Sequence, residues 1–195
     1  MEYICGVTFA PFACAGAFFK PGANESLAMM KERTGANFVI FVPGGLQETP
    51  QSEEICFTSK ATMEDDELIA MIEYAKEIGL RVALKPTVNC KNGTWRAHIN
   101  FFDEDVPCEP KWFASYTAFQ LHYAKIAEQH DCEMFIAGCE MVMSEHREAE
   151  WRKLLSDIRQ VYHGLLSYNT DKYQEHRVNW WDAVDVISSS GYYPY

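Results

Sequence analysis

Six short apolar runs divide the chain, and most of them are separated by longer stretches with helical periodicity. A short run of apolar residues without a polar face is typical of a strand that is covered on both sides, as in a parallel sheet. We therefore predict strands at residues 4–9, 37–42, 80–86, 133–139, 164–169 and 184–190.

Helices are predicted in four of the intervening stretches. The clearest one carries Thr62 and Asp65 in the pattern of a capping box, and Gly79 ends it. An earlier helix is expected to begin with Asn24 as its N-cap and to end at Gly35. The apolar stripes of the four helices are Leu27 and Met30; Leu68, Ile69, Ile72 and Ala75; Phe113, Tyr116, Phe119, Tyr123 and Ile126; and Trp151, Leu154, Leu155 and Ile158.

Strands that alternate with helices run parallel, either in an open doubly wound sheet or in a (β/α) barrel. No G-x-G-x-x-G pattern follows the first strand, which removes the main reason to expect a dinucleotide fold. Residues with polar or aromatic side chains recur after the strands, where a barrel would gather them at one mouth. We predict an α/β fold of the (β/α)8 TIM-barrel type, with about six of its eight βα units in a single domain over residues 1–195. The residues after the strands are Phe9, Lys85, Asn89, Glu140, Asn169 and Tyr192 or Tyr193.

Glu140 is the strongest catalytic candidate in the chain. The apolar run that starts after Glu133 leads directly into this carboxylate. The carboxyl ends of parallel strands face the ligand-binding crevice, so a carboxylate there is better placed for catalysis than one on a helix surface. A surface glutamate at the start of a loop is the alternative interpretation of the same residues.

The composition is that of a soluble globular domain. The chain has 195 residues, of which 48% are hydrophobic, enough for one substantial core. A formal net charge of −11 argues against a nucleic-acid partner, because such binding depends on lysine and arginine. Aromatic residues make up 14% of the chain, and they serve either core packing or stacking on sugar rings.

The cysteines and the N-terminus indicate a reducing, cytoplasmic location. The seven cysteines are scattered and form no C-x-x-C pair, which argues against a disulfide framework. Residues 1–6 lack the pattern of a signal peptide, although a trimmed leader would leave secretion open. No apolar run is long enough to cross a bilayer, so no membrane partner is expected.

Six segments along the chain carry a family likeness. They are residues 6–12 (GVTFAPF), 85–89 (KPTVN), 95–99 (WRAHI), 138–140 (GCE), 167–173 (SYNTDKY) and 185–194 (DVISSSGYYP). Together, and in this order, they resemble segments of bacterial β-mannanases of glycoside hydrolase family 113. The likeness covers nearly the whole chain.

The resemblance implies an endo-β-1,4-mannanase that acts on mannan or mannooligosaccharides by a retaining double displacement. In this clan of (β/α)8 glycosidases the acid/base glutamate ends the fourth strand, and the nucleophile glutamate ends the seventh. Counting strands along this chain puts Glu140 at the end of the fourth, which agrees with the acid/base role. Such an acid needs a raised pKa and a second carboxylate at about 5–5.5 Å.

The resemblance also implies that the nucleophile lies beyond residue 195. Glu145, Glu148, Glu150 and Glu175 are the available carboxylates, and none of them matches the family position. We therefore expect the chain to be a C-terminally incomplete barrel that does not complete the reaction alone. Open first and sixth strands would then favour self-association.

Eight residues are predicted to bind the substrate. In the loop after the third strand, Trp95 offers a face for a pyranose ring, and Arg96 and His98 can bond hydroxyl groups, although loop residues of these types are often only packed or solvated. Lys85 is expected at the mouth because an unpaired buried ammonium is costly. Of the paired tyrosines, Tyr192 is preferred as the inward-facing one, and in this clan such a tyrosine bonds the nucleophile. The full set is Phe9, Lys85, Asn89, Trp95, Arg96, His98, Asn169 and Tyr192.

Two alternatives come from other classes of protein. A non-catalytic carbohydrate-binding barrel would keep the same face and lack the nucleophile. A metal-dependent TIM-barrel hydrolase would need histidines and aspartates at several strand ends, but His122, His130 and His146 fall in or beside helices. No metal and no cofactor are therefore expected.

Overall fold

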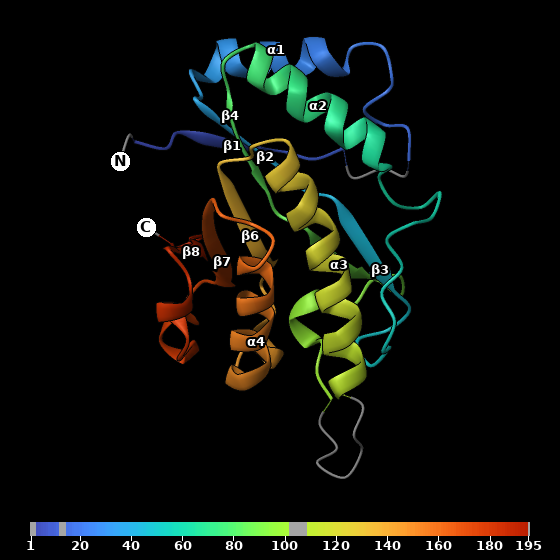
Figure 1. The fold of residues 1–195 in the computed structure, drawn as a ribbon, viewed down its shortest axis with the longest axis vertical. Helices are drawn as coiled ribbons and strands as arrows, with labels where there is room; N and C mark the ends of the chain where they lie inside the picture. The colour runs from blue at the N-terminus through green and yellow to red at the C-terminus, as the bar shows by residue number, and fades with distance from the viewer. Residues whose placement is uncertain (1–2, 12–14, 102–108, 195) are drawn as a thin grey trace.

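The computed structural model describes residues 3–11, 15–101 and 109–194. Six strands form one parallel sheet in the spatial order β1-β2-β4-β6-β7-β8 (Figure 1). This arrangement confirms the predicted α/β class and the six strands. Their bounds are β1 (Gly6–Phe9), β2 (Phe38–Phe41), β4 (Arg81–Leu84), β6 (Met134–Cys139), β7 (Leu165–Asp171) and β8 (Val186–Ser190).

Four α-helices connect these strands: α1 (Ala23–Thr34), α2 (Asp65–Glu77), α3 (Glu109–Gln129) and α4 (Glu148–Arg159). Helices α3 and α4 lie side by side on one face of the sheet (Figure 1). The large apolar core lies between these helices and the sheet, and Trp112, Phe135 and Trp151 are fully buried in it.

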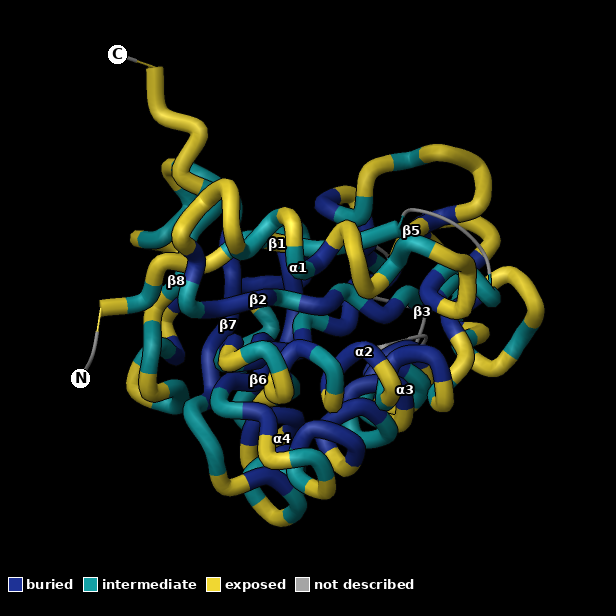
Figure 2. Tube along the Cα trace, turned by 90° about the horizontal axis from the view of Figure 1, so that it is seen from above, coloured by how far each residue is buried: buried dark blue, intermediate teal, exposed yellow. Residues whose placement is uncertain are grey.

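A smaller apolar cluster lies on the other face of the sheet. It contains Phe38, Ala83, Met134 and Ile136, which alternate along their strands with residues of the helix-side core. Every residue of β6 is buried. Figure 2 shows the buried trace in dark blue in the interior of the molecule and the exposed trace in yellow at its periphery. Strands with two covered faces are the pattern of a (β/α) barrel wall and explain the continuous apolar runs in the sequence.

The two predicted N-caps are each wrong by two residues. Helix α1 has Gly22, with φ 91°, as its N-cap in place of Asn24. Helix α2 starts after Glu64, whose backbone N–H donates to the Glu67 carboxylate over 2.9 Å. The hydroxyl of Thr62 instead bonds the backbone of Ser59 in the preceding turn. Asn24 lies in the first turn of α1, and Thr62 lies two residues before the α2 cap, so each prediction mistook a nearby polar residue for the cap.

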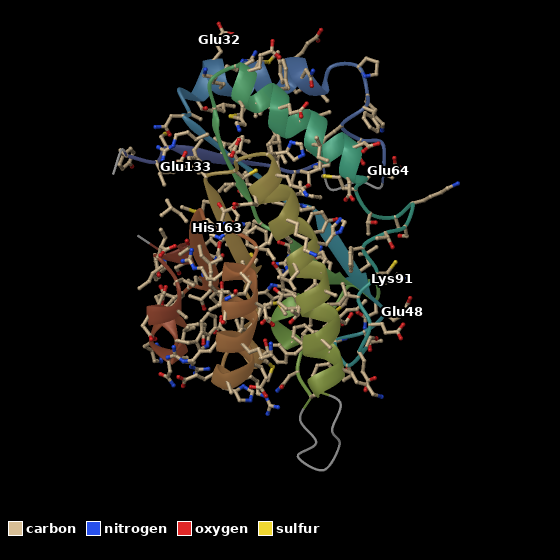
Figure 3. The ribbon with its side chains drawn as sticks, viewed as in Figure 1. Glu32, Glu48, Glu64, Lys91, Glu133 and His163 are labelled. Atoms are coloured by element: carbon tan, nitrogen blue, oxygen red, sulfur yellow. The ribbon has the colours of Figure 1, made fainter. Side chains whose placement is uncertain are left out.

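A second, two-stranded parallel sheet was not predicted. It pairs β3 (Gly44–Gln47) with β5 (Thr87–Cys90), in segments that the sequence interpretation treated as loops. Pro43 and Pro86 separate these strands from β2 and β4, and a proline has no N–H to donate to a ladder. Beyond the strands, Glu48 and Lys91 form an ion pair at 2.5 Å (Figure 3).

Short 3₁₀ helices complete the chain: η1 (Arg96–His98), η2 (Val142–Ser144), η3 (Glu175–Arg177) and η4 (Trp181–Ala183). Trp180, just before η4, is fully buried and stacks on Trp151 with ring centroids 5.0 Å apart. Trp180 therefore has a packing role in the core. In the part of the chain that the structure covers, no helix is long and apolar enough to cross a membrane.

Candidate active site

The carboxyl end of β6 presents Glu140 in an unusual backbone conformation. Glu140 has φ 56°, and the pairing of β6 with β7 shifts register between Ile136 and Cys139. A bulge of this kind redirects the side chains that follow it. Gly138, with φ 145°, makes the bulge possible, because a Cβ there would lie 2.8 Å from the Tyr116 hydroxyl oxygen.

The Glu140 carboxylate accepts hydrogen bonds from three side chains. Trp95 Nε1 lies 3.1 Å from Oε2, and Arg96 Nη1 lies 2.8 Å from the same oxygen. The hydroxyl of Ser190 donates to Oε1 over 2.7 Å. The Glu140 side chain is only 14% exposed, so these bonds form at the edge of the protein interior. The structure thus brings together Glu140, Trp95 and Arg96, which the sequence selected separately.

The pKa of Glu140 is lowered, contrary to the expectation for a general acid. Burial alone would raise this pKa, but the hydrogen bonds from Ser190 and Trp95 and the charges of Arg96 and Lys85 outweigh burial. The carboxylate is therefore held in its ionised form in the absence of substrate.

Arg96 links the carboxylate to a neighbouring part of the site. Its Nη2 donates to Asn89 Oδ1 over 2.9 Å, and its Nε donates to the Val88 carbonyl oxygen over 3.2 Å. The guanidinium is therefore fixed in one orientation by the backbone and side chains of β5. Asn89, predicted to bind substrate, positions Arg96 in this state.

Ser190 is a site residue that the sequence interpretation missed. Its hydroxyl accepts a bond from Asn169 Nδ2 over 3.0 Å while donating to Glu140. The Asn169 backbone oxygen also accepts the Glu140 N–H over 2.7 Å. Asn169, predicted as a sugar contact, thus supports Glu140 from two directions. The available signal for Ser190 was its place at the end of a predicted strand.

Two adjoining cavities lie at the carboxyl ends of the strands. The cavity beside Glu140 has a volume of about 440 Å³, and Lys85 and Tyr192 line it as predicted. The second cavity, of about 310 Å³, includes Asn89 and extends toward β3. Arg96 borders both. The other residues that line the first cavity are Thr8, Ala10, Val42, Thr87 and Cys139.

Phe9 and His98, two of the predicted substrate contacts, are not among the residues that line the two cavities. Phe9 stacks on Phe18 with ring centroids 5.8 Å apart and packs against the helix-side core, whereas Thr8 lines the cavity. Adjacent strand residues face opposite sides of a sheet, so the position next to Phe9 is the one that faces the cavity. His98 is exposed, and its ring meets the Trp95 ring edge-on at 5.9 Å.

The paired tyrosines differ in their surroundings. Tyr192 is 77% exposed and borders the Glu140 cavity. Tyr193 points elsewhere, because its hydroxyl donates to the Glu175 carboxylate. This difference agrees with the preference for Tyr192 as the cavity-facing residue.

The structure covers five of the seven cysteines, and all five are free thiols; Cys14 and Cys108 lie outside the described residues. Within the described ranges, no group of three or more histidine, cysteine, aspartate or glutamate side chains is arranged to hold a metal ion. The metal-dependent alternative therefore has no ligand set in this part of the chain.

Comparison with known proteins identifies close relatives. The family model described as Glycoside Hydrolase Family 113 matches residues 7–195. A solved GH113 β-1,4-mannanase, also solved as a complex, shares 56% identity with a TM-score of 0.96. The GH113 β-mannanase of Alicyclobacillus acidocaldarius, solved in complex with ManMIm, shares 41% identity with a TM-score of 0.95.

The alignments cover the whole of this chain but only part of each related mannanase. All of this chain aligns, but it spans only 64% and 63% of the lengths of those mannanase chains. A β-mannanase from Streptomyces thermolilacinus, at 17% identity and a TM-score of 0.52, shares the fold alone. No curated protein matches the chain by sequence.

Proposed function

Because this chain belongs to glycoside hydrolase family 113, we propose that it supplies the acid/base half of an endo-β-1,4-mannanase active site. The observation that carries the proposal is the position of Glu140, a carboxylate with three hydrogen-bond donors at the mouth of a parallel sheet. The similarity to solved β-1,4-mannanases supports mannan or mannooligosaccharides as the substrate.

In this mechanism Glu140 acts twice. Protonated Glu140 gives its proton to the glycosidic oxygen while a nucleophilic carboxylate attacks the anomeric carbon, and the bond between that carbon and the leaving oxygen breaks. The Glu140 carboxylate then takes a proton from water, whose oxygen displaces the enzyme carboxylate from the sugar. The product keeps the β configuration of the substrate.

We further propose that the nucleophile lies in sequence beyond Tyr195. The chain spans 64% of the related mannanase, so that relative has room for further strands. A second carboxylate about 5–5.5 Å away would raise the pKa of Glu140 by like-charge repulsion. It would thereby oppose the lowering that Arg96 and the other donors cause.

Substrate binding is assigned to the residues around the two cavities. Trp95 is 45% exposed, which leaves a ring face open for a pyranose. The ammonium of Lys85 and the exposed His98 ring are suited to bond sugar hydroxyls, and Tyr192 borders the same space. Arg96 lines both cavities and Asn89 lines the second, so a bound chain that passes from one cavity to the other would meet them in turn.

The test is hydrolysis of β-1,4-mannan by the natural chain in which residues 1–195 occur, with Glu140→Gln as the variant. We expect kcat to fall by roughly a hundredfold or more, because the variant cannot exchange a proton. The matched control is Glu133→Gln, because Glu133 (labelled in Figure 3) lies just before the other end of β6 and pairs with Arg81. Proton NMR of the first product should show the β-anomer, and initial formation of the α-anomer would refute the retaining mechanism.

One observation favours a second candidate function, a barrel that binds carbohydrate without cleaving it. The lowered pKa of Glu140 suits a hydrogen-bond acceptor better than a proton donor. Calorimetric titration with mannooligosaccharides separates the two functions. Saturable binding without turnover in the natural chain would support the binding protein and overturn the enzyme. The cytoplasmic location stays a prediction from the sequence.

A further inference from the structure

The turn after β6 is held in a conformation that its residues do not favour on their own. Glu140 has φ 56°, in the left-handed region that glycine adopts far more readily than glutamate. Such a residue persists only where neighbouring groups fix the backbone on both sides. The bonds of the two amides at this turn therefore determine where the Glu140 carboxylate points.

Strand β7 accepts both of these amide bonds. The Glu140 N–H donates to the Asn169 backbone oxygen over 2.7 Å, which is an ordinary ladder bond. The Met141 N–H instead donates to the side-chain hydroxyl oxygen of Tyr168 over 3.1 Å. One of the two anchors of the turn is therefore a side chain, whose orientation depends on a further partner.

That partner is Glu145. The Tyr168 hydroxyl donates to Glu145 Oε1 over 2.7 Å, and the Thr170 hydroxyl donates to the same oxygen over 2.7 Å. A tyrosine hydroxyl has a single hydrogen. Because that hydrogen is donated to Glu145, the Tyr168 oxygen has a lone pair directed at the Met141 N–H and accepts its hydrogen bond.

The burial of Glu145 makes this arrangement costly. The residue is 2% exposed, and its Oε2 atom has no hydrogen-bond partner among the described residues. Its backbone oxygen also accepts the Trp180 Nε1–H over 3.0 Å, which fixes the residue in place. A carboxylate in an apolar aromatic cluster is expensive in free energy, so a role in holding the neighbouring turn would account for its presence.

We propose that Glu145 is a positioning residue that orients the Tyr168 hydroxyl and, through it, holds the Met141 backbone and the Glu140 carboxylate in place. This inference rests on the proposed function for its catalytic consequence. Glu145 touches neither of the two cavities, so it acts only through the turn.

The first test compares Tyr168→Phe with Tyr162→Phe in the natural chain that contains residues 1–195. Tyr162 is the matched control, because it is also buried, and its hydroxyl donates to the backbone oxygen of Cys132, which precedes β6 at the end away from Glu140. We expect Tyr168→Phe to lower kcat on β-1,4-mannan roughly tenfold or more with little change in KM, because the acid/base is displaced. Equal kcat in the two variants would overturn the proposal.

The second test exchanges Glu145 itself. Glu145→Leu removes the acceptor and is expected to lower kcat as far as Tyr168→Phe does, whereas Glu145→Gln keeps an acceptor oxygen and should recover most of the loss. The pH dependence of kcat should also change in the leucine variant, since the contacts of Glu140 would shift. Leucine and glutamine variants with the same kcat would refute the role of the acceptor.

A measurement that does not depend on hydrolysis tests the positioning role of Glu145 independently of the proposed function. Hydrogen exchange of the Met141 amide should speed up in Tyr168→Phe and Glu145→Leu and stay unchanged in Tyr162→Phe. If the unmodified protein hydrolyses no mannan, the proposed function fails, and this measurement still decides the positioning role. Unchanged exchange at Met141 in both variants would refute it.

Discussion

Arg96 donates through Nη1 to Glu140 Oε2 over 2.8 Å, and this ion pair lies at the boundary between the two cavities of the site. It holds together the 3₁₀ turn η1 and the end of strand β6, which are 44 residues apart in sequence. The pair also favours the ionised form of Glu140, so it affects both the shape and the protonation of the site.

Removal of the Arg96 charge should shift the pH profile of hydrolysis. Burial tends to raise the pKa of Glu140, while Arg96 is among the groups that lower it, so Arg96→Gln should raise this pKa. An acid catalyst loses activity as the pH rises through its pKa. The alkaline limb of kcat/KM is therefore expected to move to higher pH, and a move to lower pH would contradict the assignment. Arg159→Gln, which alters a distant pair with Asp185, is the control.

Two tryptophans should separate binding from stability. Trp180→Ala is expected to cost about 3–5 kcal/mol of unfolding free energy, because a fully buried ring that stacks on Trp151 is lost. Trp95→Ala should leave the denaturation midpoint almost unchanged and raise KM for mannooligosaccharides, because the ring is 45% exposed at the site. Urea unfolding and steady-state kinetics of both variants measure the contrast.

Gly138→Ala should disturb the site by adding one methyl group, without removing any polar side chain. The new methyl would lie 2.8 Å from the Tyr116 hydroxyl oxygen and 2.9 Å from the Tyr168 ring, at φ 145°. A cost of about 1–3 kcal/mol and a lower kcat are expected from this overpacking. Gly44→Ala is the control, since no atom lies within 4 Å of its added Cβ. Equal unfolding free energies for the two variants would contradict the close approach.

The buried Glu145 carboxyl should make stability depend on pH. Burial is the main reason that its pKa is raised, so this group favours the folded state fully below its unfolded pKa and loses that contribution as pH rises through its folded pKa. Relative to the unmodified protein, Glu145→Gln should therefore become progressively more stable as the pH rises above the unfolded pKa of a glutamate, about 4. Urea unfolding of both proteins at a series of pH values measures the difference, and a relative gain of the glutamine variant on acidification would contradict the prediction.

The isolated 195-residue polypeptide is expected to self-associate. Among the described strands, β1 and β8 each pair on one side only, and they leave backbone groups free at both edges of the sheet. Light scattering over a range of concentrations would reveal the association. A stable monomer at every concentration would contradict this prediction.

The sequence predicted best those features that a local residue pattern determines by itself, such as a buried strand or the end of a helix. An apolar run that ends in Glu140 locates a buried strand and its mouth, and the structure confirms both. Gly35 likewise marks the end of α1, with φ 65°. These features depend on local chemistry, so they can be recognised without knowledge of what packs nearby.

Other parts of the site depend on contacts between distant segments. Nothing local distinguishes Ser190 from an ordinary strand serine, and its role arises only when β8 lies near Glu140. Nothing in the sequence marks Glu145 as buried, because Tyr168 and Thr170, which bond its carboxylate, come from β7. The face of Phe9 required knowledge of strand parity, because a shift of one residue exchanges the two sides.

The two prolines that interrupt the paired strands constrain how this region tolerates changes in length. Phe41 pairs with Leu84 and Gly44 with Thr87, so β2 with β4 and β3 with β5 keep one spacing of 43 residues across the interruption. A single residue inserted between Phe41 and Gly44 would break that spacing and turn the side chains of one short sheet to the opposite face. Natural insertions here are therefore expected only as matched pairs in both segments.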